Sequence, residues 1–172
     1  MLQAFYIPSA SMEPTLDGPG DRVLVEKVSY HFRSPSRGDV VVFEKDLGPP
    51  ATAGHNQPVW TDIGSAFKEL FGFPTGGQED LIKRVMAVGG DKIEARGGAV
   101  YVNGRKVNEP YLAPGVKTFS FGPITVPQGK LFVMGDNRGN SDDSRSFGPI
   151  PVDKVVGRGF IVIWPPSHFA TL

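Results

Sequence analysis

The chain has 172 residues, of which 22 are glycine, 16 are proline and none is cysteine, and its 18 basic and 18 acidic side chains cancel. The balanced charge, without a basic stripe, argues against nucleic acid as a partner, and the lack of cysteine excludes disulfides and thiolate metal sites. This length is enough for one hydrophobic core with a small appended lobe. The high glycine and proline content favours short strands joined by tight turns, so we expect a mainly β fold.

No apolar run approaches the roughly 20 residues that a membrane-spanning helix needs. The first seven residues are mostly apolar, but they lack the basic region and the cleavage site of a secretory signal peptide. We therefore expect a chain that is soluble as given and has no transmembrane segment within it. A membrane anchor preceding Met1 stays open, because the chain begins abruptly against its most distinctive motif.

Five apolar segments, each bounded by turn residues, predict the strands of the core. The second of them is a continuous Val-Val-Val-Phe run, which is typical of a strand buried on both faces. The predicted strands are 22–28, 40–43, 81–88, 130–134 and 155–164.

The segment 44–80 predicts a loop over 44–58 and a helix over 61–73, in which apolar residues recur at helical spacing. That helix either packs on the sheet or touches a membrane, and the role of the whole insertion stays open. Residues 92–126 predict a small β lobe, with Asn103-Gly104 as a hairpin turn. The lobe would be inserted between the two halves of a discontinuous core, 1–91 and 127–172.

Two serines, Ser9 and Ser11, lie between prolines near the start of the chain. A serine hydroxyl is a poor nucleophile unless a neighbouring base takes its proton. Lys83 lies in the apolar strand 81–88, where period two places it on the face of Val85 and Ala87. A lysine in that position either snorkels at an edge or is buried for chemistry.

Three segments that lie far apart in sequence, 9–16, 83–91 and 135–145, with 37–43 between the first two, together closely resemble the bacterial type I signal peptidase family. These enzymes are Ser–Lys endopeptidases that remove signal peptides from exported proteins, and the resemblance covers the chain from Ile7 to Trp164. It implies a complex β fold of coiled antiparallel sheets with one or two short helices. The self-cleaving repressor proteases of the SOS response are expected to share this fold.

The resemblance implies that Ser11 is the nucleophile of an acyl-enzyme mechanism and that Lys83 is the general base. The Ser11 backbone N–H and the Ser9 hydroxyl match the family's oxyanion donors, and the Ser141 hydroxyl matches the group that orients the lysine ammonium. A lysine with its usual pKa of roughly 10.4 is protonated at neutral pH. Burial among apolar neighbours disfavours the charged form, so we expect the strand to bury Lys83.

The resemblance also places an Asp–Arg pair beneath the site, where it holds the loop 135–145 against the lysine strand. Asp143, Arg84 and Arg145 are therefore expected to be structural supports. Gly139 is a departure from the family pattern, since many relatives carry an acidic residue there, and it puts in doubt only details of that loop.

The three histidines, His31, His55 and His168, are scattered and lack the spacing of a metal site or of a Ser–His dyad. We expect no metal and no cofactor. The endoplasmic-reticulum branch of the family has histidine at the base position, so Lys83 favours the bacterial or organelle branch.

Two alternatives to a signal peptidase remain. One is another Ser–Lys protease of the same fold, such as a self-cleaving repressor, although the chain shows no helix-turn-helix. The other is a non-catalytic β-rich binding module, for which the pairing of Ser11 with Lys83 would be coincidental.

The resemblance implies substrates that are preprotein signal peptides with small residues one and three positions before the cut. An extended peptide along a sheet edge turns alternate side chains toward the protein, and Ile7, Met12, Ile82 and Val85 are candidate walls of the pockets. The apolar residues 5–7 are suited to touch a bilayer. The family is anchored in the bacterial plasma membrane with its catalytic domain outside the cytoplasm, and we expect the same here.

Overall fold

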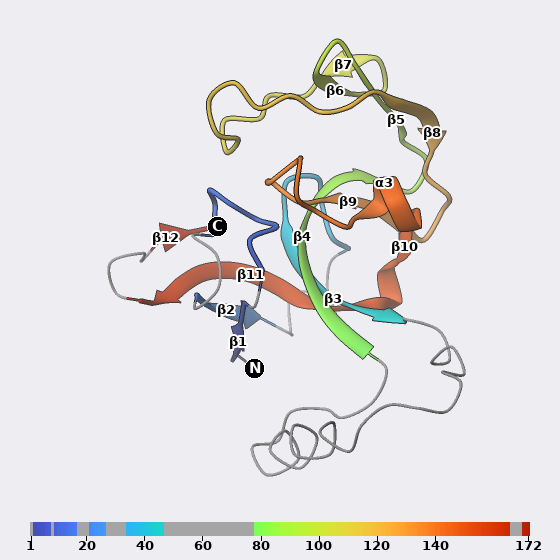
Figure 1. Ribbon diagram of the computed structural model, residues 1–172. Helices are drawn as coiled ribbons and strands as arrows, with labels where there is room; N and C mark the ends of the chain where they lie inside the picture. The colour runs from blue at the N-terminus through green and yellow to red at the C-terminus, as the bar shows by residue number, and fades with distance from the viewer. Residues whose placement is uncertain (1, 8, 17–20, 27–33, 47–77, 166–169) are drawn as a thin grey trace, which may run out of the picture. The chain divides into compact units, whose positions relative to one another are not determined.

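The computed structural model describes residues 2–7, 9–16, 21–26, 34–46, 78–165 and 170–172. The fold is mainly β, which confirms the prediction, and its strands form two antiparallel sheets (Figure 1). In the described part of the chain, helix is limited to α3, Ser144–Phe147, and to one turn of 3-10 helix, Val152–Lys154. The predicted helix over 61–73 and the loop before it lie outside the described residues.

The larger sheet has eight strands in the order β1-β2-β11-β3-β4-β9-β10, with β12 paired to β11. Its order brings the start of the chain, the predicted lysine strand and the last long strand into one layer. Its strands are β1 (Leu2–Tyr6), β2 (Arg22–Glu26), β3 (Val40–Asp46), β4 (Gln78–Val88), β9 (Lys130–Met134), β10 (Ile150–Pro151), β11 (Val155–Trp164) and β12 (Ala170–Thr171).

The smaller sheet has four strands in the order β7-β6-β5-β8. The Asn103-Gly104 turn joins β6 to β7 with φ values of 52° and 76°. Two positive φ values in succession are what a type I′ hairpin turn requires, so the predicted hairpin is confirmed. The strands are β5 (Lys92–Arg96), β6 (Ala99–Val102), β7 (Arg105–Lys106) and β8 (Phe121–Thr125).

Two apolar clusters form the core, and β4 contributes to both. The first cluster packs Ile82 with Ile7 and Met12 and with side chains of β2, β3 and β11. The second packs Met86 with side chains of β5, β6 and β9, so it joins the smaller sheet to the β4–β9 part of the larger one (Figure 1). Lys83 therefore lies in β4 between residues of two apolar cores.

The prediction that side chains alternate strictly along β4, with Lys83, Val85 and Ala87 on one face, is wrong beyond Val85. The pairing of β4 with β9 shifts register between Val85 and Ala87, and a bulge of this kind moves the following side chains to the other face. Met86 and Ala87 consequently both join the second cluster. A short apolar strand gives no sign of such a bulge in its sequence.

The described chain divides into two compact units, residues 1–43 with 82–172 and residues 44–81. The smaller sheet belongs to the first of these units. A separate lobe over 92–126 stays a prediction.

Candidate active site

Ser11 lies in the turn that follows β1. Met12 and Leu16 anchor this turn, because both are almost fully buried and the Leu16 N–H donates to the Met12 carbonyl at 3.0 Å. The Ser11 side chain is only 7% exposed. The turn therefore holds a hydroxyl group at a fixed place beside the first apolar cluster.

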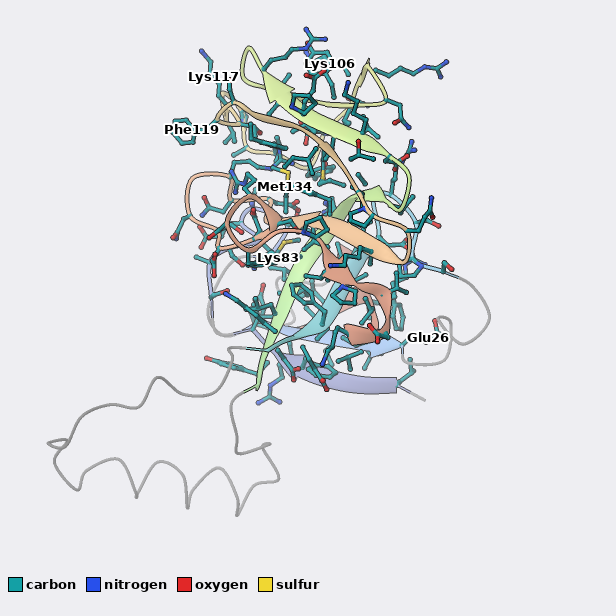
Figure 2. The ribbon with its side chains drawn as sticks, turned by 90° about the vertical axis from the view of Figure 1, so that its right-hand side faces the viewer. Glu26, Lys83, Lys106, Lys117, Phe119 and Met134 are labelled. Atoms are coloured by element: carbon teal, nitrogen blue, oxygen red, sulfur yellow. The ribbon has the colours of Figure 1, made fainter. Side chains whose placement is uncertain are left out.

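Lys83 is buried, with 2% of its surface exposed, so the snorkelling alternative is wrong. Its Nζ lies 2.7 Å from Ser11 Oγ and 3.0 Å from the Ile82 carbonyl oxygen, both within hydrogen-bonding distance. Figure 2 shows Lys83 inside the protein beside β4, while Lys117 and Phe119, which lie between β7 and β8, extend outward. Ser11 and Lys83 lie 72 positions apart in sequence, yet their side chains are direct neighbours.

The Ser9 hydroxyl lies at the same place. Its Oγ is 3.2 Å from Ser11 Oγ, and the residue itself is exposed. The serine–lysine pair therefore has a second hydroxyl on its solvent side.

Ser141 comes close to this pair through Gly135. A β-carbon on Gly135 would lie 2.2 Å from Ser141 Oγ and 2.4 Å from the Ser11 carbonyl oxygen. The Ser141 hydroxyl is buried and does not donate to or accept from the Lys83 amine, so its lysine-orienting role stays a prediction.

Asn137, which the sequence reasoning did not single out, fastens the nucleophile turn to the loop 135–145. Its backbone N–H donates to the Ser11 carbonyl at 3.0 Å, and its side-chain amide donates to the Ala10 carbonyl at 3.1 Å. The signal was present in the sequence, because Asn137 lies in the Gly-Asp-Asn-Arg stretch directly after an apolar strand.

The ion pair that joins this loop to the lysine strand is Arg84–Asp136. Arg84 donates to both carboxylate oxygens of Asp136, at 2.9 Å from Nε and 2.7 Å from Nη2, and to the Gly38 carbonyl at 3.0 Å. Thr15 Oγ1 donates to the same carboxylate at 2.5 Å. The expected Asp–Arg link therefore exists, but its acid is Asp136, which sequence reasoning missed among several aspartates of the loop.

Asp143 and Arg145 form a second ion pair, which lies entirely within the loop. Arg145 donates to both Asp143 oxygens at 2.8 Å, and Asp143 also accepts the Gly135 N–H at 2.9 Å. Burial raises the pKa of Asp143, but the hydrogen bonds from Arg145 and Gly135 outweigh it and hold that pKa below its usual value. This carboxylate caps α3 and fixes the Gly135 backbone.

Of the four candidate pocket residues, Ile7, Met12 and Ile82 pack in one apolar cluster and are at most 5% exposed. Val85 is fully buried elsewhere and lines a cavity of about 580 Å³ between β4 and the β6–β7 hairpin. Neither Ser11 nor Lys83 lines that cavity. Ile7, Met12 and Ile82 thus remain candidates for the substrate pocket, and Val85 does not lie with them.

The three histidines lie outside the described residues. Within the part of the chain that the structure describes, no group of acidic or histidine side chains could hold a metal ion. No helix in that same part is long and apolar enough to cross a membrane.

A buried amine in hydrogen-bonding contact with a serine hydroxyl is the arrangement of base and nucleophile in Ser–Lys hydrolases. Comparison with known proteins gives the family. Residues 1–164 match the model of the signal peptidase family, peptidase S26. The chain belongs to this family and is a hydrolase of the peptidase class.

Three relatives illustrate the similarity. Signal peptidase I of Mycobacterium tuberculosis is 40% identical over 202 residues, which cover 98% of this chain and 67% of the relative. A probable signal peptidase I-2 of Synechocystis is 39% identical over 170 residues, covering 99% of this chain and 66% of that one. The chloroplastic thylakoidal processing peptidase 1 of Arabidopsis thaliana is 39% identical over 161 residues, which cover 94% of this chain and 42% of the relative.

Proposed function

We propose that this protein is a signal peptidase that cleaves N-terminal signal peptides from exported preproteins, with Ser11 as nucleophile and Lys83 as general base. The observation that carries the proposal is the 2.7 Å contact between Lys83 Nζ and Ser11 Oγ, made where both side chains are buried. Family membership supplies the substrate class, since the relatives are named signal peptidases.

In the acylation step, Ser11 Oγ attacks the carbonyl carbon of the scissile peptide bond while its proton passes to the neutral Lys83 amine. The negative charge on the former carbonyl oxygen is met by the Ser11 backbone N–H and the Ser9 hydroxyl, which lies 3.2 Å from Ser11 Oγ. The tetrahedral intermediate then breaks the C–N bond. The lysine ammonium returns its proton to the leaving amine, so the mature chain departs with a free N-terminus.

In the deacylation step, water attacks the ester carbonyl and gives its proton to Lys83. The ester bond breaks, Ser11 regains its proton from the ammonium, and the signal peptide leaves with a carboxylate. The site must therefore hold an amine that is neutral at the start of each half-reaction. A lysine that is 2% exposed between two apolar clusters meets this requirement, because burial disfavours the charged form.

The substrate is proposed to lie as an extended strand beside β4. The pairing of β4 with β9 begins at Arg84, so Ile82 and Lys83 precede the part of that edge which β9 occupies. A peptide beside these two residues would bring its carbonyl to Ser11 by strand addition. The apolar cluster of Ile7, Met12 and Ile82 lies next to that position.

We further propose that the protein works at a membrane surface on the extracytoplasmic side. The observation in its favour is that β1 presents Leu2 and Tyr6 to solvent, at 55% and 56% exposure. An apolar edge of this kind suits the side of the site at which a signal peptide in the bilayer is presented.

The test is preprotein cleavage by Ser11→Ala and Lys83→Ala, each compared with wild type at equal folded concentration. We expect both to lose activity and to keep their fold, and the double variant to be little worse than either single one, because residues of one catalytic unit are not additive. Comparable activity in either well-folded variant refutes the assignment.

A further inference from the structure

Two residues from the segment between β7 and β8, Glu109 and Tyr111, contact both arginines that adjoin the serine–lysine pair. One of these arginines is Arg84, which follows Lys83 in β4. The other is Arg138, three residues after Gly135 in the loop that holds Ser11. The mechanism proposed above uses neither Glu109 nor Tyr111.

Glu109 holds Arg138. The Arg138 Nη2 donates to Glu109 Oε1 at 2.5 Å, and their side chains are 1% and 9% exposed. The Arg138 Nη1 donates to Thr118 Oγ1 at 2.7 Å, and its Nε donates to the Gly135 carbonyl at 3.1 Å. Glu109 and Thr118, both between β7 and β8, thus hold the Arg138 guanidinium, and the Nε of that guanidinium holds the Gly135 carbonyl.

Tyr111 holds Arg84. The Arg84 guanidinium carbon lies 4.0 Å from the centroid of the Tyr111 ring, a distance at which a cation is attracted to the ring face. The Tyr111 hydroxyl donates to Glu109 Oε1 at 3.2 Å. Burial raises the pKa of Tyr111 above its ordinary value, so the phenol stays a donor.

Among the described residues, three arginine–carboxylate pairs lie near the site, and the carboxylate of one of them comes from outside the loop 135–145. Asp136 and Asp143 both belong to the loop 135–145, whereas Glu109 comes from the segment next to the smaller sheet. A buried guanidinium whose carboxylate is removed must shift or draw in water. The Glu109–Arg138 pair is therefore one of the supports of Gly135, through the hydrogen bond from Arg138 to the Gly135 carbonyl, beside Asp143, which accepts the Gly135 N–H.

We propose that Glu109 and Tyr111 are positioning residues, which hold Arg138 and Arg84 so that Ser11 Oγ and Lys83 Nζ stay in hydrogen-bonding contact. The segment between β7 and β8 then helps to position the serine–lysine pair. The inference rests on the proposed roles of Ser11 and Lys83. A displacement of about 1 Å far from the reacting atoms can cost 10²-fold in rate, so loosening either arginine should be visible in kcat.

The experiment compares Glu109→Gln, Tyr111→Leu and Tyr111→Phe with wild type on a synthetic peptide that has alanine one and three residues before the cut. The readouts are the single-turnover cleavage rate at saturating enzyme and the steady-state KM, well below the Tm of each variant. We expect Glu109→Gln and Tyr111→Leu to lower the rate about tenfold to 10²-fold with KM within about twofold. Tyr111→Phe keeps the ring on Arg84 and should lose less than Tyr111→Leu.

The control is Glu94→Gln, which removes a carboxylate from Arg96 within the smaller sheet, away from Arg84, Arg138 and the loop 135–145. It should leave the cleavage rate near that of wild type. A wild-type rate in Glu109→Gln, or an equal rate loss in Glu94→Gln, overturns the proposal. If Glu109→Gln does not fold, Thr118→Val and the two Tyr111 variants decide, with unchanged rates counting against it.

Ser11→Ala is measured beside these variants so that the two proposals are separated. Activity in Ser11→Ala overturns the proposed function itself. An inactive Ser11→Ala together with fully active Glu109 and Tyr111 variants overturns only the positioning roles.

Discussion

Gly135 lies so close to Ser11 that a β-carbon on it would sit 2.4 Å from the Ser11 carbonyl oxygen. The same atom would lie 2.2 Å from Ser141 Oγ. Real β-carbons do not approach other atoms this closely, so any side chain here forces the loop 135–145 away from the nucleophile turn. Because glycine has no side chain, Gly135 allows the loop 135–145 to approach the nucleophile turn closely enough for the two segments to form hydrogen bonds.

Gly135→Ala is expected to lower both stability and activity. Overpacking of this kind typically costs about 1–3 kcal/mol, and a shift of the Ser11 turn by about 1 Å should lower kcat by roughly 10²-fold. Chemical denaturation and peptide cleavage measure the two effects. The control is Gly139→Ala in the same loop, where a β-carbon meets nothing within 4 Å. Equal stability and equal cleavage rates of Gly135→Ala and Gly139→Ala would contradict the need for glycine at position 135.

Asp143→Asn should destabilise the protein in a pH-dependent way. The folded-state pKa of Asp143 is held down, mainly by Arg145 against the opposing effect of burial. Its contribution is therefore present above the unfolded pKa of roughly 3.9 and is lost as the pH falls through the lower folded value. Breaking a buried ion pair costs about 3–5 kcal/mol. We therefore expect a gap of that order between the unfolding free energies of wild type and Asp143→Asn at pH 7.

The measurement is the free energy of unfolding of both proteins from neutral to acidic pH. The gap between wild type and Asp143→Asn should narrow only at the acid end. Asp153→Asn, an exposed carboxylate in the 3-10 turn, serves as the control and should show little change. A gap that stays constant down to the lowest pH would mean that Asp143 contributes through packing alone.

The fold class and the serine–lysine pair could be predicted from the sequence, but for different reasons. Glycine, proline and β-branched runs carry local information, which is enough for a mainly β fold and for the hairpin at Asn103-Gly104. The contact of Ser11 with Lys83 spans 72 positions, and no local pattern carries it. That prediction depended on the resemblance of three distant segments to one family.

The partners of the arginines could not be predicted in the same way. The loop 135–145 holds three aspartates, and a sequence does not show which of them faces Arg84. The structure selects Asp136, because β4 and β9 pair Arg84 with Met134, two residues before it. Glu109 gave no signal in the sequence, since its ion pair with Arg138 forms where the segment before β8 meets the loop.

The activity should rise with pH as Lys83 loses its proton. A free lysine titrates at roughly 10.4, and burial can depress such a value by up to about 3–5 units. We expect kcat/KM to rise through an apparent pKa well below 10, measured on a peptide without titratable groups near the cut. A profile that climbs only above about pH 10 means that the working amine is solvated, which the 2% exposure of Lys83 argues against.

The substrate preference is expected to follow from the packed apolar surface that Ile7, Met12 and Ile82 are proposed to form beside the serine–lysine pair. Ile7, Met12 and Ile82 pack together there and are at most 5% exposed. An extended peptide turns residues two apart to the same side, so the residues one and three before the cut would both meet this surface. The residue between them would point away from it.

Model peptides with alanine, leucine or phenylalanine at each of these three positions test the preference through kcat/KM. A bulky side chain forced against the packed surface should cost at least about 1–3 kcal/mol, which is roughly tenfold or more in rate. The position two before the cut is the internal control and should accept all three residues, because its side chain does not face the protein. Equal turnover of alanine and phenylalanine one residue before the cut would leave a Ser–Lys protease without the specificity of a signal peptidase.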